Sequence, residues 1–547
     1  MKHTVLGSFF ITLWLVVISE QSEEATTSPS TFDDNVISMS LLNYQENEAV
    51  KRRITLVPTS SYTINIINIS SIVSFLIFQV HTYQYNITLS YDKLNLNKVS
   101  NRSLFGSNVG LYIVPKKKET AFFVKNDNVR QVETLLVVIP YFKQAPVPGG
   151  CNMEFNIEVA PYQKLFVNDS IVILDSQSTS LPLTSNETKR RCIFPETYRF
   201  FLDKHDYSIE SYFNAISGML TVKDILRNGK KIPVRTISPL RRIFSLNKGM
   251  GTVYAAVAVY GNDSSAYVPI FTYGFNYALY PEDGQLLNDT LSKLLCILTF
   301  IVGSLCVFQG HKNPNIEFVV YTTYFGGIIS YIVIKSLASY DITTNIKISI
   351  FGSLFFFFVG VISYVTRKYI NIIVSILLFG FLCSSIFYFS VQDSLAILEN
   401  DWMFWLIYLS IALVTMIILI VMLYFGSLLT CAVLGGFTIV LTIAYFANTN
   451  FVYIIINVIR RLTVSSFNYA IVSYPLQSAD MILIVFWVLL VVIRICNDDI
   501  FGCSYSIMCR RGFRNISDQT PSESEPFFKR KVPYNHHKRK QYAYANN

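Results

Sequence analysis

Charged residues are scarce in this chain. They make up 15% of its 547 residues, whereas 52% of the residues are hydrophobic and the mean hydropathy is positive. An ordinary soluble domain carries charge on about 25% of its residues. The excess of apolar residues lies in the second half of the chain. The composition therefore excludes an ordinary soluble protein and favours one with a large part embedded in a membrane.

Histidines are also few, and the common catalytic motifs are missing. The chain has 6 histidines, and His311 is the only one near the apolar half, so a zinc site built there from histidines has no ligands. His81 and His205 do not lie at metal-ligand spacing from each other or from the cysteines. No Gly-x-Ser-x-Gly elbow and no phosphate-binding glycine loop is present. We therefore predict no enzyme activity, no cofactor and no metal site.

The second half instead contains seven apolar segments, each close to the length that crosses a bilayer. A helix needs roughly 20 residues to span a hydrocarbon core of about 30 Å. Residues 291–496 are therefore predicted to form an all-α bundle of seven transmembrane helices. Gly326-Gly327 and Gly435-Gly436 mark close helix packing or, alternatively, hinges. The segments are Leu291–Gln309, Ile316–Leu337, Ile346–Val365, Ile370–Val391, Trp402–Tyr424, Gly426–Ala447 and Ala479–Cys496.

The amino terminus has the pattern of a secretory signal. Lys2 and His3 precede an apolar run from Val5 to Ile18, and the chain then becomes polar and acidic. An uncleaved anchor is the alternative, although the run is short for a span. We predict a signal peptide over residues 1–19, which delivers the following segment to the lumen or the cell exterior. Seven spans then place the carboxyl terminus in the cytoplasm.

The segment between signal and bundle has the pattern of an all-β ectodomain. Short runs of β-branched and aromatic residues alternate with turn formers, which favours two β-sandwich-like domains over residues 20–160 and 161–290. Pro146–Gly150 is expected to break the pattern between two strands, and Tyr207–Asn228 is expected to form one helix ending at Gly229. The predicted strands include Phe75–Val80, Asn86–Tyr91, Gly110–Val114, Ala121–Val124, Leu135–Phe142, Met153–Val159, Ile171–Asp175, Tyr198–Leu202, Arg242–Leu246, Thr252–Tyr260 and Ala266–Tyr273.

Covalent modification of the ectodomain is expected from its composition. Cys151 and Cys192 are its only cysteines, and an oxidising compartment favours a disulfide between them over two free thiols. Asn-x-Ser/Thr sequons are dense, in agreement with a secreted segment. The predicted glycosylation sites are Asn68, Asn86, Asn101, Asn168, Asn186 and Asn262.

One connection conflicts with the positive-inside rule. Short loops and a basic tail agree with a cytoplasmic carboxyl terminus, but Arg460 and Arg461 fall in a connection that this topology puts outside. Phe451–Ile459 predicts an interfacial or partly re-entrant helix, whose polar groups share one face. We expect an arginine of this pair to bind Asp480 at the start of the last span. The alternative is that all three side chains reach water independently.

The tail, residues 497–547, is basic and carries much of the net charge of +9. Beside a bilayer such a segment attracts anionic lipid, so membrane lipids rather than nucleic acid are the expected partner. Cys496, Cys503 and Cys509 cluster beside the bilayer, where cysteines are either palmitoylated or remain reduced thiols.

Several stretches, in order along the chain, are similar to the transmembrane 7 superfamily member 3 family, whose membrane half is shared with transmembrane protein 198. The most specific is the Pro-Val-Pro-Gly-Gly-Cys-Asn stretch that begins at Pro146. The resemblance implies a non-enzymatic membrane glycoprotein linked to cell survival, to damping of endoplasmic-reticulum stress and the unfolded-protein response, and in vertebrate islets to insulin secretion. The others are Ser70–His81, Ala266–Pro269, Gly310–Lys312, Asn457–Arg461 and Pro475–Asp480.

Three functional readings follow. The first is a regulator that acts through protein partners, which the sequence does not identify. The second is an orphan receptor with a ligand-binding ectodomain, although the receptor motifs of G-protein coupling are missing from the spans and loops. The third is a transporter or channel, for which the spans offer no evident chain of ionisable residues.

Overall fold

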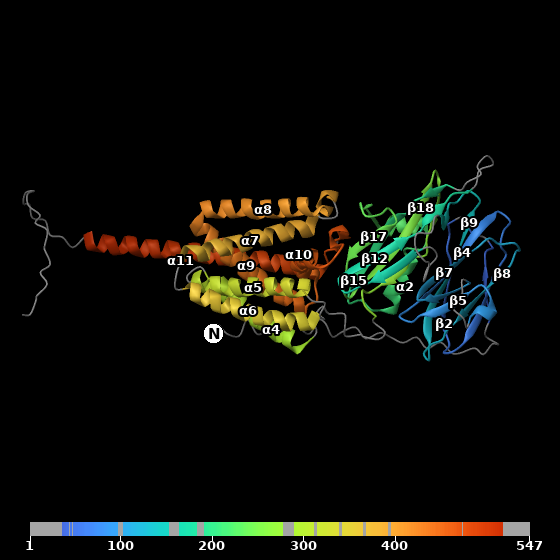
Figure 1. Cartoon of the computed structure of the whole chain (residues 1–547), viewed down its shortest axis with the longest axis horizontal. Coiled ribbons are helices and arrows are strands. Elements are labelled where there is room, and N and C mark those ends of the chain that lie inside the picture. Colours follow the sequence, from blue (N-terminus) through green and yellow to red (C-terminus); the bar gives the residue numbers. More distant parts are fainter. Residues whose placement is uncertain are drawn as a thin grey trace, which may run out of the picture.

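The computed structural model describes residues 36–517 except 43, 46, 97–101, 152–162, 183–190, 277–288, 311–313, 338–341, 365–367, 392–394 and 473. Two β-rich domains lie at one end of the molecule and a helical bundle at the other, with the last helix continuing beyond the bundle (Figure 1). The all-β ectodomain and the all-α seven-helix bundle that the sequence predicts are both present.

The first domain is a sandwich of two sheets. Its core lies between them and includes Ile64, Phe78 and Phe122. Strand β3 alternates half-buried and buried residues, as expected for a strand with one face on a core. The first sheet has the order β1 (Val36–Ser40), β3 (Ser61–Ile67), β8 (Thr120–Lys125), β5 (Ile87–Ser90), β6 (Ser103–Gly106), and the second β2 (Val50–Leu56), β9 (Val132–Phe142), β4 (Val73–Thr82), β7 (Asn108–Ile113).

The second domain combines three sheets with two short helices, α2 (Ile209–Ser217) and α3 (Val222–Asn228). Its last sheet also receives β20 (Ile270–Thr272), which pairs with β18. The sheet orders are β10 (Val147–Cys151), β13 (Ser178–Ser180), β14 (Cys192–Ile193); β11 (Gln163–Val167), β12 (Ile171–Ser176), β17 (Arg241–Ser245), β21 (Ala470–Ile471); and β16 (Lys230–Ile232), β15 (Glu196–Lys204), β18 (Met250–Tyr260), β19 (Asp263–Ala266).

Two expectations for the ectodomain were wrong. The single helix predicted over Tyr207–Asn228 is two helices, because Ser208 caps the start of α2 and Thr221 caps a second start, that of α3. The stretch Pro146–Gly150 does not separate strands, since Val147–Cys151 is itself strand β10, paired with β13. β10 is an edge strand, where proline is tolerated. This pairing puts the division between the domains before the predicted residue 160, while the expected strand Met153–Val159 lies outside the described residues.

A second core joins the two ectodomain domains. Successive residues of β9 point to opposite faces, so Leu136 and Val138 face the first sandwich, whereas Leu135 and Val137 pack with the second domain. This two-sided burial explains why β9 is apolar at successive positions from Leu135 onward rather than alternating. Tyr212 of α2 adds a polar link: its hydroxyl lies 2.9 Å from the Thr82 carbonyl and 3.1 Å from Asn108 Oδ1, and these two acceptors share its one hydrogen.

His81 lies fully buried beside this shared surface. Its Nδ1 lies 3.0 Å from Asn108 Oδ1 and its Nε2 lies 3.0 Å from the Gln79 side-chain amide. A neutral imidazole satisfies both contacts by donating from Nδ1 and accepting from the amide nitrogen of Gln79, once the amide is turned over. Burial lowers the pKa of His81 to about 4, from an ordinary 6.5.

Acidification should therefore destabilise the first domain. Between pH 6.5 and 4, His81 binds a proton in the unfolded chain but not in the folded chain. The free energy of unfolding therefore decreases as the pH is lowered, by about 3 kcal/mol at pH 4. Hydrogen exchange of β4 and β7 in the full-length protein, measured from pH 7 to 4.5, checks this. The His81→Gln variant should be less stable at pH 7 but lose this pH dependence; an unchanged dependence would refute the assignment to His81.

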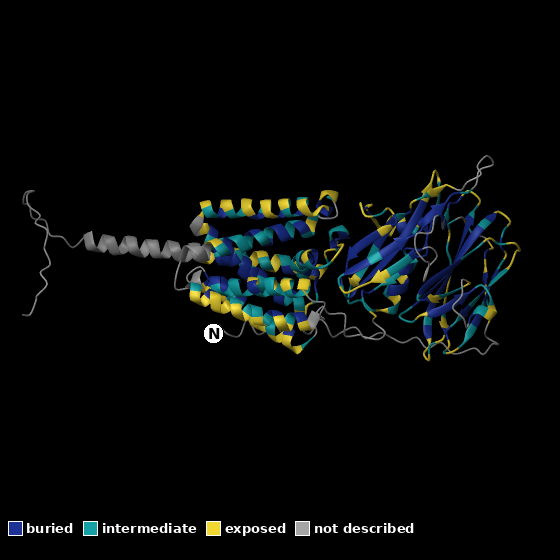
Figure 2. Cartoon of the chain, viewed as in Figure 1, coloured by how far each residue is buried: buried dark blue, intermediate teal, exposed yellow. Residues whose placement is uncertain are grey.

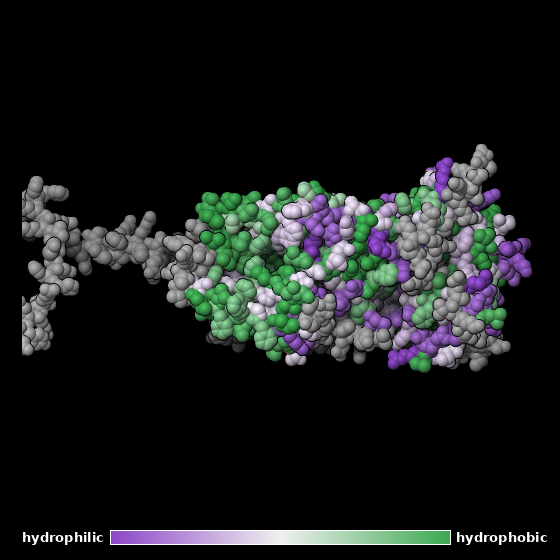
Figure 3. All heavy atoms as spheres, viewed as in Figure 1, coloured by the Kyte–Doolittle hydropathy of each residue, from purple (hydrophilic) through white to green (hydrophobic). Residues whose placement is uncertain are grey.

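The bundle contains the seven predicted spans. The central helix is α9, of whose span 67% is buried inside the protein, against 11% for α6. The outer helix faces are exposed and apolar, as lipid contact requires (Figures 2 and 3). The helices are α4 (Thr290–Gln309), α5 (Pro314–Leu337), α6 (Ile342–Tyr364), α7 (Lys368–Val391), α8 (Asp401–Val421), α9 (Leu423–Phe446), α10 (Tyr453–Thr463) and α11 (Ser478–Ser517), of which all but α10 are long enough to span.

The glycine pairs serve close packing, one of the two alternatives drawn from the sequence. A Cβ on Gly326 would lie 2.2 Å from the ring of Phe356, and one on Gly435 would lie 2.9 Å from the backbone nitrogen of Val307. The first contact packs a side chain of α6 directly on the backbone of α5, and the second brings the backbones of α9 and α4 together.

Candidate functional site: the junction between the ectodomain and the bundle

The ectodomain and the bundle meet around helix α10, which faces β17 and β12 (Figure 1). As predicted, its polar residues share a face, and Asn457, Arg460 and Arg461 are all buried. The face is covered by protein: by the second ectodomain domain on one side and by the loop before α8 on another. The predicted interfacial or re-entrant helix is thus a short helix packed between the two halves of the molecule.

Ser245, the last residue of β17, is the centre of the first contact. Its hydroxyl donates to Asn457 Oδ1 at 2.8 Å and accepts from Arg460 Nη1 at 3.1 Å and from Tyr474 Oη at 2.6 Å. The same Arg460 nitrogen donates to the Leu246 carbonyl at 2.7 Å. Three side chains of the membrane half therefore converge on one ectodomain residue.

Arg461 makes the second contact, with the loop that precedes α8. Its Nη2 donates to Asp401 Oδ1 at 2.6 Å and to the Leu398 carbonyl at 3.0 Å, and the guanidinium lies 4.5 Å from the centre of the Phe404 ring. An arginine that is neutralised in this way carries no free charge to the bilayer surface. In the topology predicted from the sequence, this pairing would account for an arginine on the side where the positive-inside rule disfavours it.

A buried ion pair makes the third contact. Arg235 Nη1, from the ectodomain, lies 3.1 Å from Glu399 Oε1, and the side chains are only 2% and 5% exposed. Glu399 also accepts from the backbone N–H and the hydroxyl of Thr236. Burial alone raises the pKa of the Glu399 carboxyl, but the hydrogen bonds from Thr236 and Arg235 outweigh burial and lower it. The carboxylate therefore stays ionised at neutral pH and binds the ectodomain.

The fourth contact is a shared sheet. Residues Ala470 and Ile471, in the connection between α10 and α11, form strand β21, which pairs in parallel with Ile243 and Phe244 of β17. Ala470 also packs in a small core with Ile171 and Ile243 of the ectodomain. The membrane half thus supplies the edge strand of an ectodomain sheet, and this arrangement fixes the register between the halves.

The expected pairing of Asp480 with Arg460 or Arg461 was wrong, and so was the alternative that all three side chains reach water. Asp480 is the third residue of α11, and its carboxylate accepts from the backbone N–H of Gln477 at 3.1 Å and of Asn450 at 2.9 Å. This contact caps the helix, where a negative charge is favourable. Because backbone donors already satisfy the carboxylate, it needs no arginine.

Lys204, at the end of β15, is a cation that interacts electrostatically with Asp480. Its Nζ donates to the Thr449 carbonyl at 3.3 Å and lies 5.0 Å from the centre of the Tyr453 ring. Burial lowers its pKa to about 8, although the Asp480 charge acts in the opposite direction. The junction is therefore held by hydrogen bonds to backbone carbonyls and by ring contacts as well as by ion pairs.

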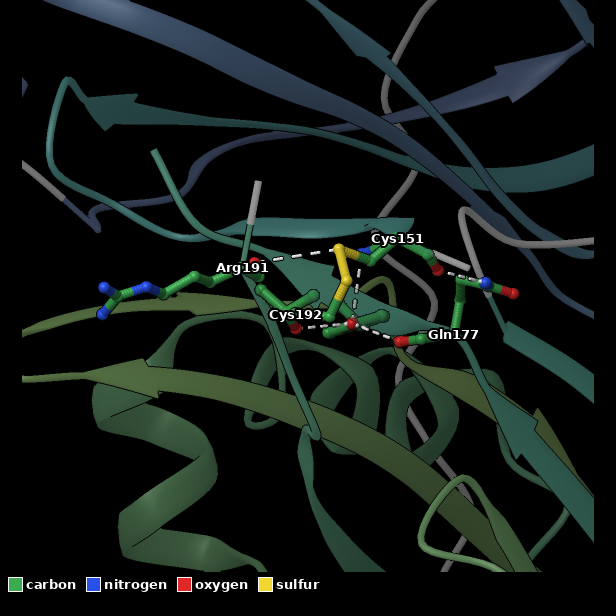
Figure 4. Close-up of a disulfide and its surroundings, with 7 residues drawn as sticks. Cys151, Gln177, Arg191 and Cys192 are labelled. Carbon is green, nitrogen blue, oxygen red and sulfur yellow. Dashed lines mark hydrogen bonds between the residues drawn. A yellow bond between two sulfur atoms is a disulfide. The ribbon is translucent and has the colours of Figure 1, made fainter. Parts of the chain in front are cut away.

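The predicted disulfide is present. Cys151 of β10 is bonded to Cys192 of β14, with Cα atoms 5.7 Å apart, and Gln177 donates to the Cys151 carbonyl at 2.6 Å (Figure 4). The bond lies in the second domain and closes a separation of 41 residues.

The predicted modification sites are placed as follows. Four of the sequon asparagines are exposed on the ectodomain, so a glycan has room there, while Asn101 and Asn186 lie outside the described residues; the exposed four are Asn68, Asn86, Asn168 and Asn262. Cys496 is exposed on α11, and the backbones of Cys503 and Cys509 continue that helix. Glycosylation and palmitoylation at these positions stay predictions.

Among the described residues of the bundle, sequence reasoning missed two buried ionisable side chains. Glu317 of α5 accepts from the Cys431 thiol at 3.0 Å, and Arg494 of α11 donates to the Val307 carbonyl at 2.7 Å. Both lie near the end of the bundle that is remote from the ectodomain. Because each lies close to the end of its span, it hardly changes the mean hydropathy of the segment, and a search for apolar segments does not reveal it.

The fold and the junction define a class of protein: a seven-span membrane protein whose two-domain β-sandwich ectodomain is packed on its helical bundle. Three family models match the chain in order: the TM7SF3-like N-terminal immunoglobulin-like domain over residues 42–141, the TM7SF3-like second immunoglobulin-like domain over 146–278, and the TM7S3/TM198-like domain over 296–496. The chain therefore belongs to the TM7SF3-like family.

Named relatives agree with this assignment. Transmembrane 7 superfamily member 3 of Homo sapiens is 27% identical over 449 residues, which cover 78% of this chain and 77% of the relative. The protein of the same name from Mus musculus is 26% identical over 449 residues, which cover 78% of each chain.

Proposed function

We propose that this protein is a non-enzymatic regulator of cell survival and of the endoplasmic-reticulum stress and unfolded-protein response, in which the ectodomain and the bundle act as one unit. The survival and stress roles come from the family resemblance. The junction supports the mechanical part, because the membrane half completes an ectodomain sheet through β21 and binds Ser245 and Arg235 through buried contacts. A partner that binds the ectodomain would thus act directly on the ends of α8, α10 and α11.

Orientation and partners belong to the same proposal. The ectodomain faces the lumen or the exterior and the basic tail faces the cytoplasm. The protein can therefore bind one partner on the ectodomain side and act on another on the cytoplasmic side. The exposed sequon asparagines carry glycans, and Cys496, Cys503 and Cys509 hold the tail against the inner leaflet. Its partners are proteins on either side and the surrounding lipids.

Depletion followed by rescue tests the proposal. Cells that lack the protein should show a stronger stress-reporter response to tunicamycin and lower survival, and the full-length chain should restore both. The Glu399→Ala variant, expressed at the same level, should fail to restore them because it loosens the junction. Glu196→Ala is the matched control, since Glu196 forms an exposed pair with Lys231 at the opposite end of β15 from Lys204.

Two results would contradict the proposal separately. A full-length chain that leaves the stress response unchanged would remove the regulatory role. Full rescue by Glu399→Ala would show that the two halves need not act as one. Recruitment of a cytosolic transducer on addition of a soluble ligand to the ectodomain would instead favour the orphan receptor.

A further inference from the structure

A large cavity lies beside the junction, inside the bundle. Its volume is about 650 Å³, within the range of about 300–1,000 Å³ that is typical of small-molecule sites. Helices α4, α5, α6 and α10 form its walls, and the β17–β18 turn of the ectodomain covers one end through Lys248. This cavity takes no part in the contacts that support the proposed function, apart from the shared Arg460.

The cavity is long and follows α5. Val319 and Lys335 both line it, and at about 1.5 Å of rise per residue they lie about 24 Å apart along the helix axis. The hydrocarbon core of a bilayer is about 30 Å thick. Its walls between these residues are mostly aliphatic, as at Leu295 and Ile350. A single extended acyl chain has this shape, whereas a compact polar ligand does not.

One end of the cavity is cationic. Lys248, Lys335 and Arg460 line it near the ectodomain, together with one carboxylate, that of Asp169. Arg460 is buried, and its Nη1 is held by Ser245 and the Leu246 carbonyl, so its guanidinium is fixed in place. Among the described residues that line the cavity, these three cations stand against one carboxylate, which favours a ligand whose head carries a negative charge.

The cavity also opens toward the lipid. Leu298 of α4, Ile328 of α5 and Phe357 of α6 line it and are all exposed, so the cavity is not sealed by protein at these side chains. Because apolar side chains form this opening at the depth of the spans, an amphiphile dissolved in the bilayer can enter sideways with its chain first.

We propose that this cavity binds a long-chain fatty acid from the surrounding bilayer, with the acyl chain along α5 and the carboxylate among Lys248, Lys335 and Arg460. The chain alone gains nothing by leaving lipid, because lipid tails are as apolar as the cavity wall. The preference for the cavity must therefore come from the carboxylate and its cations. An uncharged analogue with the same chain should then fail to compete.

Photolabelling of the full-length protein in phosphatidylcholine nanodiscs tests this proposal. A diazirine-bearing fatty acid should label peptides of α4, α5 and α6, and an excess of oleate should abolish that labelling while an excess of oleyl alcohol should not. Labelling spread evenly over the bundle surface, or equal competition by oleyl alcohol, would overturn the proposal. Stronger competition by a lysophospholipid than by oleate would show that the occupant is not a fatty acid.

Two matched pairs of variants distinguish binding of the acyl chain from binding of the carboxylate. Ile350→Trp fills the cavity and should reduce labelling at least tenfold, whereas Ile348→Trp, on the exposed face of the same helix, should not change it. Lys335→Gln should weaken competition by oleate about fivefold, and Lys347→Gln, an exposed cation that does not line the cavity, should not. Should Ile350→Trp fail to fold, the lysine pair still decides: equal values for the two lysine variants would refute the role of the cationic end.

Discussion

Replacing Glu399 with alanine should lower the free energy of unfolding by about 3–5 kcal/mol, because it leaves the Arg235 guanidinium buried without its carboxylate. The loss should be concentrated at the junction, where Thr236 also loses its acceptor. Denaturant unfolding of the detergent-solubilised chain measures the total. Hydrogen exchange in the β16–β17 connection and in the loop before α8 shows whether the two sides separate.

A double variant distinguishes loss of the pair from loss of packing. Arg235→Met combined with Glu399→Leu replaces both charges by apolar groups of similar size, and such replacements are often neutral or stabilising. The double variant should therefore recover most of the lost stability. Glu196→Ala should cost much less, about 1 kcal/mol, because its pair with Lys231 is exposed and the Tyr198 hydroxyl that donates to it at 2.8 Å is only partly buried. If Glu399→Ala were no worse than Glu196→Ala, the ion pair would not hold the junction.

The local features of this fold could be predicted from the sequence, because they depend on neighbours in the chain. Apolar length gave the seven spans, and helical spacing placed Asn457, Arg460 and Arg461 on one face of α10. The split between α2 and α3 was also within reach, since Ser208 and Thr221 are both cap residues followed three positions later by a backbone donor that they accept from.

The partners at the junction could not be predicted, because they come from distant parts of the chain. Asp480 was the acid nearest in sequence to the arginines, but Arg461 binds Asp401, which is 60 residues away, and Arg460 binds Ser245, which is 215 residues away. Strand β21 has two residues, too few for any periodicity to show. The apolar run of β9 did not indicate which domain each face of the strand would pack against. Burial on two sides is a property of the assembled fold.

Loss of the Cys151–Cys192 bond should destabilise the second ectodomain domain by about 4 kcal/mol. The bond closes a separation of 41 residues, and the loop-closure entropy that it removes from the unfolded chain accounts for a value of this size. Hydrogen exchange of β12, β15 and β18 in the Cys151→Ala, Cys192→Ala double variant should rise accordingly, while the bundle helices should change little.

Reducing agent supplies the control. Dithiothreitol should destabilise the native protein as much as the double substitution does, and should have no further effect on the double variant. Cys383→Ala, which removes a free cysteine of α7, should leave the response to dithiothreitol intact. Because β10 and β14 both pair with β13, loss of the bond should free both strands together, and the freed β10 edge should then exchange as fast as β14. Native protein that keeps its stability in dithiothreitol would show that the sheet, rather than the disulfide, holds this part of the domain.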